Sequence, residues 1–338
     1  MCCILSDKVY HIFLKIANLF DKFFFVAYNI FVIKFHNNGG FIMPKFGVSI
    51  YSISRNILNG TITPEQGVEW LCTQGSEVIE IVPFGINLLE DPSLAGRLRK
   101  TADKFSVPID NYSINADFLM KTPAEIEQEI DRVKAHIKAA KDLGISTLRS
   151  DCAGYRRPIE QNTIETFLEE LPIITKAYET LAEYAATFNI KLLLENHGFH
   201  ANGCDRVRLI LKNVKSGNFG HQLDVGNYIC MDDKPEIAVK KMLPFATTVH
   251  MKDFYVRRTD PGDATQFDCS GAWFRSVGGQ YLRGSILGQG DLDTVDIVHS
   301  VKASGYDGNI YIEYEGMEDC YYGTKVSLDN LKRIWNEV

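Results

Sequence analysis

Apolar and polar positions along residues 46–336 repeat one unit: a short apolar run, a polar loop and an amphipathic segment with helical spacing. Short runs rich in Val, Ile and Leu are typical of buried strands, whereas apolar residues at i, i+3, i+4 and i+7 are typical of helices. The pattern predicts eight strands, at about 46–51, 77–82, 108–113, 146–150, 190–195, 220–224, 247–252 and 309–314. It also predicts eight helices, at about 64–74, 91–104, 123–142, 160–188, 205–214, 235–242, 292–303 and 325–336.

Two of the helix starts carry capping chemistry. Thr122-Pro123-Ala124-Glu125 offers a hydroxyl at the cap, a proline at the first helical position and a glutamate three residues after the cap. Together these groups satisfy the free N–H groups of a first helical turn. Thr63-Pro64-Glu65-Gln66 repeats the signal, and Gly144 is suited to the left-handed conformation that ends the longer helix. The sequence therefore predicts helix starts at 64 and 123.

Eight strand and helix units in succession favour a closed parallel barrel. We therefore predict an α/β fold of the (β/α)8 TIM-barrel type, built as a single domain. An open, doubly wound sheet is the structural alternative, because alternating strands and helices also build that fold. No Gly-x-Gly-x-x-Gly follows the first predicted strand, which argues against a dinucleotide-binding sheet.

Two segments stand apart from the repeat. We predict that residues 1–43 are a non-core N-terminal extension or an artefact of the start site, and that the catalytic barrel covers 44–338. The longest apolar run in the extension, residues 23–33, is about half of the ~20 residues that span a bilayer, so we expect no membrane partner. The second segment, residues 255–287, is too long for an ordinary connection and is typical of a functional insert.

Composition narrows the class of partner. The chain has a net charge of −7 and 45% hydrophobic residues, and no run of Lys or Arg is long enough to follow a phosphate backbone. We therefore expect a small-molecule ligand and no nucleic acid. Eight scattered cysteines without a C-x-x-C pair indicate reduced thiols, and we predict a cytoplasmic protein.

Four of the predicted strands end on a residue type that binds metals: Glu195, Asp224, His250 and Glu313. Burying an unpaired charge costs several kcal/mol or more, so these four residues need a common compensation. The carboxyl ends of the strands meet at one mouth of a parallel barrel. Three carboxylates and one imidazole suit Mn, Mg, Co or Zn. We therefore predict one divalent metal ion bound by all four side chains.

Alternation along the strands extends the site. His197 and Lys252 each follow a predicted ligand by two residues, so each shares a face with it. We predict that both bind substrate oxygens. Glu315 shares a face with Glu313 and remains an alternative ligand, but Glu313 is preferred because it directly ends the apolar run 310–312.

Four other histidines are assigned no chemistry. His200 and His221 lie near the predicted site strands without a ligand pattern of their own. His136 and His299 fall within predicted helices, where we expect side chains of this type to be exposed.

The insert at 255–287 contains aromatic and arginine residues, among them Trp273, Arg275 and Arg283. We predict that it is either a lid over the mouth or a contact surface of a homo-oligomer. As a lid it offers Arg275 or Arg283 to a substrate carboxylate or phosphate, because a guanidinium binds either anion through two hydrogen bonds. As a contact surface it would use Trp, Tyr and Arg, which are common anchors of protein interfaces.

Five short motifs, in this order, resemble those of the sugar phosphate isomerase/epimerase family. These are the xylose isomerase-like TIM barrels that include ketose 3-epimerases, inosose dehydratase and hydroxypyruvate isomerase, and the resemblance covers residues 44–338. The motifs are Leu194-Glu195-Asn196-His197-Gly198, Leu223-Asp224-Val225-Gly226-Asn227, His250-Met251-Lys252-Asp253, Gly288-Gln289-Gly290-Asp291-Leu292-Asp293 and Ile312-Glu313-Tyr314-Glu315.

The resemblance implies one divalent metal ion on the same four ligands and a proton-transfer pair, Glu195 and Glu313. One carboxylate would remove a proton next to a carbonyl polarised by the metal, and the other would return one from the opposite face. Asn227, an expected substrate contact, stands where ketose 3-epimerases have a histidine, and residues 198–200 lack their second glutamate. Lys252 resembles the inosose dehydratase branch, where such a lysine would contact substrate.

The sequence therefore predicts a metal-dependent isomerase or epimerase of a small keto sugar, sugar phosphate or related polyol. One alternative is a lyase of the inosose dehydratase type, which shares the metal and the fold. Another is a barrel that binds a sugar or a metal ion without turnover. A DNA-repair endonuclease is disfavoured, because that class needs a multi-metal cluster with more histidines than these strand ends provide.

Overall fold

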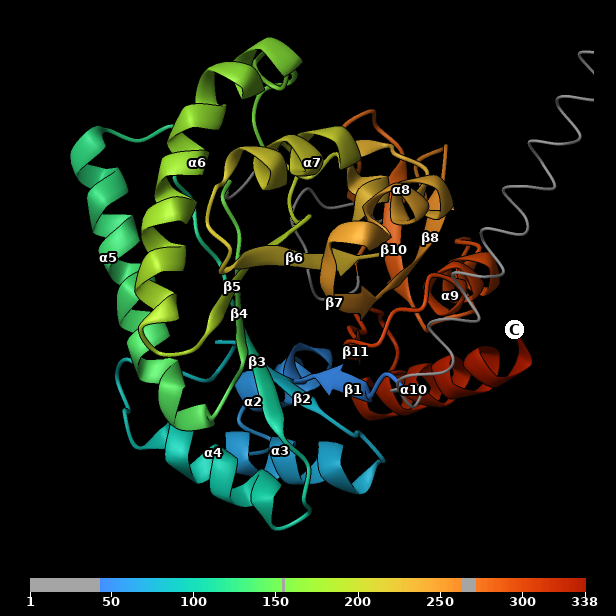
Figure 1. Ribbon diagram of the computed structural model, residues 1–338. Coiled ribbons are helices and arrows are strands. Elements are labelled where there is room, and N and C mark those ends of the chain that lie inside the picture. Colours follow the sequence, from blue (N-terminus) through green and yellow to red (C-terminus); the bar gives the residue numbers. More distant parts are fainter. Residues whose placement is uncertain (1–42, 154–155, 263–271) are drawn as a thin grey trace, which may run out of the picture. The chain divides into compact units, whose positions relative to one another are not determined.

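A closed barrel of eight parallel strands forms the centre of the molecule, with helices around its outside (Figure 1). The computed structural model describes residues 43–153, 156–262 and 272–338, and residues 44–338 form one compact unit. The strand order around the barrel is β1-β11-β7-β6-β5-β4-β3-β2. The predicted single-domain (β/α)8 barrel is confirmed, and the open-sheet alternative is wrong. The prediction for residues 1–43 lies outside the described residues, apart from Met43.

The eight barrel strands fall where the apolar runs predict them, and several are shorter than predicted. The predicted strand at 77–82, for example, is reduced to three residues. The strands are β1 (Phe46–Ser49), β2 (Ile79–Ile81), β3 (Ile109–Ile114), β4 (Thr147–Ser150), β5 (Lys191–Glu195), β6 (Phe219–Asp224), β7 (Ala246–Met251) and β11 (Ile310–Ile312).

The helices also follow the predicted order. Both predicted capping boxes are present, at Thr63 and Thr122. The last helix starts earlier than predicted, at Cys320, because the Asp319 carboxylate accepts the N–H of Tyr322 and caps it there. The helices are α2 (Ser54–Leu58), α3 (Pro64–Thr73), α4 (Leu94–Asp103), α5 (Pro123–Ala140), α6 (Ile164–Ala186), α7 (Cys204–Asn213), α8 (Pro235–Met242), α9 (Thr294–Ala303) and α10 (Cys320–Glu337). Short 3-10 turns are η1 (Ile50–Ile53), η2 (Lys141–Leu143), η3 (Ile159–Gln161), η4 (Asn227–Met231) and η5 (Leu243–Phe245).

Two layers of different polarity lie on the two faces of the barrel strands. Outward-facing residues such as Leu192 and Leu194 are buried in the main apolar core. The interior holds buried polar side chains, in which the Asn111 amide donates to Glu80 and to Gln222, both at 2.6 Å. Because side chains alternate along a strand, the outward apolar residues stabilise the fold, while the inward polar residues are available for chemistry.

The insert after β7 forms a small antiparallel sheet that the sequence pattern did not predict. It consists of β8 (Asp253–Arg257), β9 (Phe274–Arg275) and β10 (Tyr281–Ser285), in the order β8-β10-β9. Phe254, Phe274 and Leu282 pack with residues of η4 into a second apolar cluster. The described residues of the insert therefore form a small folded sheet with an apolar side. Its role as a lid or an interface stays a prediction.

Asp253 fastens the insert to the barrel. Its buried carboxylate accepts the N–H groups of Phe254 at 2.8 Å, Gly288 at 2.9 Å and Gly290 at 3.0 Å. Gly290 has no room for a side chain, because a Cβ there would lie 2.2 Å from Asp253 Oδ1. Burial raises the pKa of Asp253 to about 6, although these N–H groups favour the charged form. The Gly288-Gln289-Gly290 motif thus has a structural explanation.

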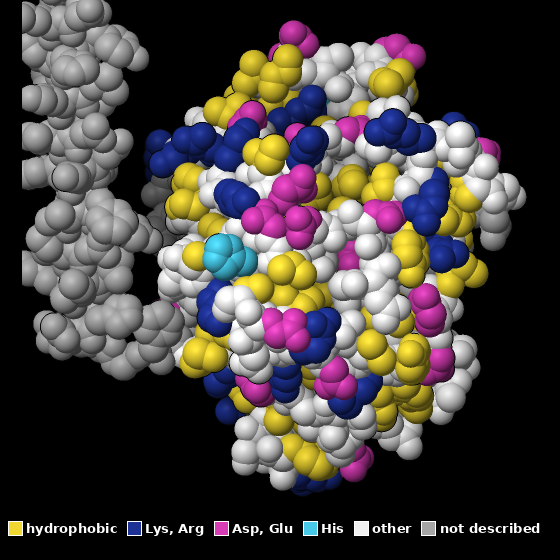
Figure 2. Space-filling model, turned by 90° about the vertical axis from the view of Figure 1, so that its right-hand side faces the viewer, with side chains coloured by type: hydrophobic (Ala, Val, Ile, Leu, Met, Phe, Trp, Pro, Cys, Tyr) yellow, Lys and Arg dark blue, Asp and Glu magenta, His cyan; other side chains and the backbone are white. Residues whose placement is uncertain are grey.

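Figure 2 shows one face of the barrel unit, on which acidic, basic and apolar side chains are interspersed. Charges of opposite sign that alternate in this way largely cancel at a distance. Within the described part of the chain, no helix combines the length and the apolar character needed to cross a membrane.

Replacing Asp253 with Ala should destabilise the protein by about 3 kcal/mol, because several buried N–H groups lose their acceptor. Urea denaturation measures this change, and limited proteolysis should show faster cleavage within 255–287. Asp307→Ala is the control, since this carboxylate lies at an exposed position outside the insert and should change stability by less than about 1 kcal/mol. Equal stability losses in the two variants would contradict the anchoring role.

Candidate metal centre

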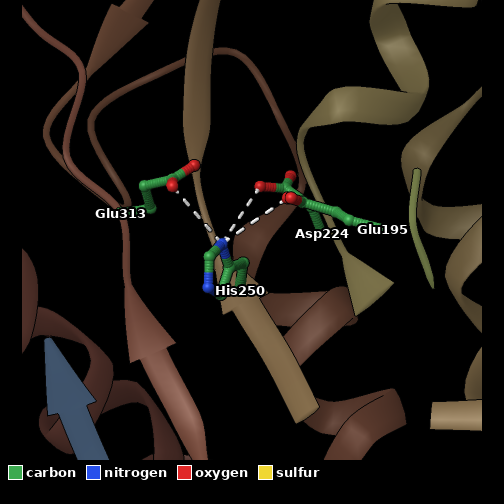
Figure 3. A group of neighbouring side chains, drawn as sticks. All are labelled: Glu195, Asp224, His250 and Glu313. Atoms are coloured by element: carbon green, nitrogen blue, oxygen red, sulfur yellow. Dashed lines mark ion pairs between the residues drawn. The ribbon is translucent and has the colours of Figure 1, made fainter. Parts of the chain in front are cut away.

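The four predicted ligands come together at the carboxyl end of the barrel. Glu195 ends β5, Asp224 ends β6, His250 lies near the end of β7, and Glu313 directly follows β11. Figure 3 shows all four side chains pointing toward a common point, with Glu313 on one side of His250 and Glu195 on the other. One ligand atom from each residue can be chosen so that all lie within 4.8 Å of one another.

The histidine is the centre of this group. Its Nδ1 lies 3.5 Å from Glu313 Oε1, 3.6 Å from Glu195 Oε1 and 3.8 Å from Asp224 Oδ2. The barrel register brings these residues level, because Asp224 pairs with His250 and Tyr311 of β11 pairs with His250 from the other side. Residues far apart in the chain therefore share one site because neighbouring parallel strands end at the same height.

Two ligand atoms are buried without a hydrogen-bond partner among the described residues: His250 Nδ1 and Asp224 Oδ2. The other oxygen of Asp224 accepts the N–H groups of Gly226 at 2.8 Å and Asn227 at 2.7 Å. Gly226 is required there, because a Cβ would lie 2.8 Å from the carbonyl oxygen of Lys252. A buried polar atom without a partner is costly, and a bound cation would satisfy both orphan atoms.

Glu80 sets the orientation and tautomer of the histidine. Its Oε2 lies 2.9 Å from His250 Nε2, and both side chains are fully buried. An ionised carboxylate only accepts hydrogen bonds, so Nε2 carries a hydrogen and Nδ1 is the nitrogen that faces the cluster, where it would offer its lone pair to a bound cation. Burial opposes ionisation, but His250 more than compensates and lowers the pKa of Glu80. Metal-binding histidines commonly have such a carboxylate behind them.

The charge balance also favours a cation. Six carboxylates gather here, and none has a side chain more than 12% exposed: Glu80, Asp151, Glu195, Asp224, Glu313 and Glu315. Against them stand the buried Arg149 guanidinium and the buried Lys252 ammonium. This excess of buried negative charge suits a divalent cation with oxygen and imidazole ligands, so the donor set fits the predicted metal.

The two proposed proton-transfer carboxylates differ in their electrostatics. Burial raises the pKa of Glu195 to about 7, and the Arg149 guanidinium that pairs with it only partly opposes the rise. Burial also acts on Glu313, but the Lys252 ammonium, 2.5 Å from Glu313 Oε2, and His250 hold the pKa of Glu313 well below its usual value. Glu195 is therefore better placed to exchange a proton near neutral pH, whereas Glu313 is held ionised.

Lys252 lies inside the cluster, as its strand position predicted. Besides Glu313, its Nζ contacts Glu315 Oε2 at 3.2 Å and Asn227 Oδ1 at 3.3 Å. Asn227 also lies 3.4 Å from Glu195 Oε1 through its Nδ2. Glu315 is thus a partner of the lysine ammonium, and the four-residue ligand group includes Glu313 instead.

His197 stands at the edge of the cluster. Its Nδ1 lies 3.1 Å from Asp151 Oδ2, and its side chain is 39% exposed. Burial lowers the pKa of His197, but the Asp151 carboxylate outweighs this effect, so the pKa is raised. An oriented imidazole with an accessible edge is suited to contact a bound substrate.

Arg275 and Arg283 are engaged within the insert. Arg275 donates from Nη2 to the Tyr281 hydroxyl at 2.7 Å. The Arg283 guanidinium lies 5.0 Å from the ring centroids of both Tyr255 and Trp273. Their described contacts do not include the four ligands, and their assignment to the substrate stays a prediction.

Sequence reasoning missed three residues of the cluster, and one expectation about a histidine was wrong. Arg149 and Asp151 stand at the end of β4, so the strand-end rule that found the ligands also applies to them. Glu80 is a charged residue between two isoleucines of β2, and this pattern could have indicated a buried functional carboxylate.

The expectation that His136 is exposed was wrong. His136 is 7% exposed and bonds the Tyr112 hydroxyl at 3.0 Å, because α5 turns it toward β3 and not toward solvent.

The remaining unassigned histidines are held by neighbouring groups or lie in solvent. His200 lies 2.9 Å from Glu170 Oε2, and His221 lies 2.8 Å from the carbonyl oxygen of Leu194. Burial lowers the pKa of His200 to about 3 and that of His221 to about 4. His299 is exposed, as its helix position predicted.

Comparisons with known proteins agree with this geometry. The family model for the xylose isomerase-like TIM barrel matches residues 68–334. No significant relative was found among curated protein sequences.

Solved structures show the same fold at low sequence identity. The protein described as the probable 3-DHS dehydratase of petrobactin synthesis from Bacillus anthracis has a TM-score of 0.65 at 16% identity, over 85% of this chain and 98% of that one. A xylose isomerase-like TIM barrel protein from Mycobacterium smegmatis in complex with magnesium has a TM-score of 0.62 at 16% identity, over 86% and 97%. D-psicose 3-epimerase with D-tagatose, from Clostridium cellulolyticum H10, has a TM-score of 0.63 at 12% identity, over 86% and 99%.

Replacing Glu80 with Gln should weaken Mn²⁺ binding about 10- to 100-fold, because the histidine loses the carboxylate that fixes its tautomer and its ligand basicity. Isothermal titration calorimetry measures the affinity. The exposed Glu69 on α3 supplies the control variant Glu69→Gln, which should bind Mn²⁺ as the parent chain does. If Glu80→Gln keeps the parent affinity, Glu80 does not orient His250 for a metal.

Proposed function

Because the chain belongs to the xylose isomerase-like TIM-barrel family, we propose that it is a divalent-metal-dependent isomerase or epimerase. Its substrate is a small keto sugar, a sugar phosphate or a related polyol. The observation that carries this proposal is the group formed by Glu195, Asp224, His250 and Glu313, with two orphan ligand atoms facing one point. Structural neighbours that act on sugars, such as the D-psicose 3-epimerase, support the substrate class.

The geometry of the site assigns a separate role to each of the two proton-transfer carboxylates. A bound divalent cation supplies a Lewis acid that makes the proton next to a substrate carbonyl easier to remove. Glu313, which the Lys252 ammonium holds ionised, accepts that proton. Glu195 lies on the opposite side of His250 (Figure 3) and returns a proton to the other face of the same carbon. Inversion at that carbon is the result.

The neighbouring polar groups position the substrate. Lys252 donates hydrogen bonds to substrate oxygens while its ammonium keeps Glu313 ionised. His197, held by Asp151, contacts a hydroxyl from its exposed edge. Asn227 lies between Lys252 and Glu195 and adds an amide at the centre of the site.

A second candidate function is a lyase that removes water from a related polyol. Lys252 favours it, because its ammonium, held in the site by Glu313 and Glu315, is placed to donate a hydrogen bond to a departing hydroxyl. The fold shared with the probable 3-DHS dehydratase from Bacillus anthracis is consistent with this reading. Both candidates begin with the same step, removal of a proton next to a carbonyl.

Incubating the Mn²⁺-loaded protein with a panel of ketoses and keto polyols in deuterated water distinguishes these functions. We expect deuterium at the carbon next to the carbonyl, together with a stereoisomer or an aldose, because the proton is exchanged with solvent before it returns. Mass spectrometry and NMR measure this outcome. A dehydrated product would support the lyase. Neither product, in a protein that binds Mn²⁺, would contradict both enzyme functions and favour a binding barrel. Protein treated with EDTA is the control and should be inactive.

Replacing Glu313 with Gln should lower the rate of deuterium exchange at least about 100-fold, because the amide neither accepts a proton nor carries charge. Circular dichroism should report an unchanged fold, and elemental analysis should report the Mn²⁺ content. Glu183→Gln, at an exposed position of α6, is the control and should keep full exchange. Retained exchange in Glu313→Gln would remove this carboxylate from the chemistry.

A further inference from the structure

Two asparagines of the loop after β5, Asn196 and Asn202, are completely buried. Asn196 directly follows the candidate ligand Glu195, and Asn202 lies shortly before α7. Burying an amide is costly unless its polar atoms are hydrogen-bonded. The hydrogen bonds of these two side chains therefore indicate what each of them holds in place.

The Asn196 amide continues the β5–β6 ladder beyond the end of β5. The parallel pairing of the two strands ends where Glu195 lies opposite Gln222, before it reaches Asp224. Beyond that point, Asn196 Oδ1 accepts the N–H of Asp224 at 2.9 Å, and Asn196 Nδ2 donates to the carbonyl oxygen of Asp224 at 2.8 Å. The side-chain amide thus supplies the acceptor and the donor that another peptide group of β5 would supply.

Backbone groups of β7 hold the other side of Asp224. Asp224 lies opposite His250 in the β6–β7 ladder, and the N–H of Val225 donates to the carbonyl oxygen of His250 at 3.0 Å. The backbone at Asp224 is therefore fixed to β7 by the sheet and to the end of β5 by the Asn196 side chain. Of these two attachments, the side chain is the one that a substitution can remove without changing a strand.

The position of this backbone decides where the Asp224 carboxylate points, because only Cβ stands between Cα and the carboxyl group. Asp224 Oδ1 accepts the N–H groups of Gly226 and Asn227, whereas Oδ2 is buried and has no hydrogen-bond partner among the described residues. Oδ2 lies 3.8 Å from His250 Nδ1. A site of this kind works only when its groups stay within about 0.5 Å of the productive geometry. A small shift of the Asp224 backbone would therefore disturb the ligand group.

Asn202 holds the next part of the loop after β6. Its Nδ2 donates to the carbonyl oxygens of Gly198 and Asn227, each at 2.8 Å. Asn227 supplies one of the two N–H groups that engage Asp224 Oδ1, and its side-chain amide lies 3.4 Å from Glu195 Oε1. Together the two asparagines tie residues 224 and 227 to the loop after β5.

We propose that Asn196 is a positioning residue for the candidate metal ligand Asp224, and that Asn202 supports it by fixing Asn227. The oxygen and the nitrogen of the Asn196 amide are both engaged by the Asp224 backbone, so Asn196 acts through that residue and is not itself a ligand. The inference deepens the proposed function, on which its metal-binding part rests. The affinity for the cation then depends on a buried amide that acts through the backbone of a ligand residue.

Asn218 offers a matched control at the opposite end of the same two strands. It directly precedes β6, and its Nδ2 donates to the carbonyl oxygens of Ala182 at 3.0 Å and Ile190 at 2.8 Å. Like Asn196, it joins a side-chain amide to backbone groups of neighbouring segments, but at the amino end of the barrel strands. Asn218→Ala therefore removes hydrogen bonds of the same kind without touching the loop that carries Asp224.

Isothermal titration calorimetry with Mn²⁺ on the full chain measures the positioning role. Asn196→Ala should weaken Mn²⁺ binding about 10-fold or more, as is typical when a group that orients a metal ligand is removed. Asn202→Ala should weaken it less, because it acts one step further from Asp224. Asn218→Ala should keep the parent affinity, although urea denaturation should show that it loses stability, as Asn196→Ala does.

Hydrogen exchange of the metal-free protein, followed by NMR, gives a second measurement that does not depend on the proposed function. The informative groups are the N–H groups of Gly226 and Asn227, because their acceptor is the Asp224 carboxylate itself. Both should exchange faster in Asn196→Ala and at the parent rate in Asn218→Ala. If Asn196→Ala does not fold, Asn196→Ser, which keeps a hydroxyl acceptor, takes its place in both measurements.

The outcomes separate this inference from the proposed function. Weaker Mn²⁺ binding together with faster exchange at Gly226 and Asn227, in Asn196→Ala but not in Asn218→Ala, supports the positioning role. If the parent chain binds no Mn²⁺, the proposed function fails, and the exchange rates alone decide whether Asn196 positions Asp224. The inference is overturned if exchange at Gly226 and Asn227 is the same in the two variants. It is also overturned if the parent chain binds Mn²⁺ and the folded Asn196→Ala variant binds it as tightly as Asn218→Ala does.

Discussion

The concentration of buried negative charge at the barrel mouth is the constraint on which the rest of the structure depends. Six carboxylates from different strand ends approach one another in a region with little access to water. Arg149 and Lys252 offset part of that charge, and the orphan atoms of His250 and Asp224 face the remainder. A barrel tolerates such a mouth because its outer face, where apolar strand residues pack against the helices, supplies the stability. A divalent cation, as proposed, would complete the arrangement.

Neighbouring side chains and backbone N–H groups fix the orientation or the charge of the candidate ligands. Glu80 fixes the tautomer of His250 from inside the barrel, and the N–H groups of Gly226 and Asn227 occupy one oxygen of Asp224 so that the other turns to the cluster. Lys252 holds Glu313 ionised. Further from the ligands, Asp253 fixes the insert through backbone N–H groups alone. The carboxylates of this region thus divide into those proposed to hold a cation and those that hold the loops around them.

The sequence by itself determined the barrel and the four side chains that meet at its mouth, because both rest on local periodicity. Apolar runs placed the strands, capping boxes at Thr63 and Thr122 placed two helices, and ligand residues at four strand ends predicted the group found in the structure. Only the tertiary structure decided which partner each buried polar side chain meets. Glu80 behind His250, Arg149 against Glu195 and the burial of His136 depend on contacts between strands or helices distant in the chain. The three-stranded sheet of the insert also arises from such contacts. The hydrophobic periodicity specifies which face of a helix or strand is buried. The partner that a buried polar group meets is set by the closure of the barrel and the register of its strands.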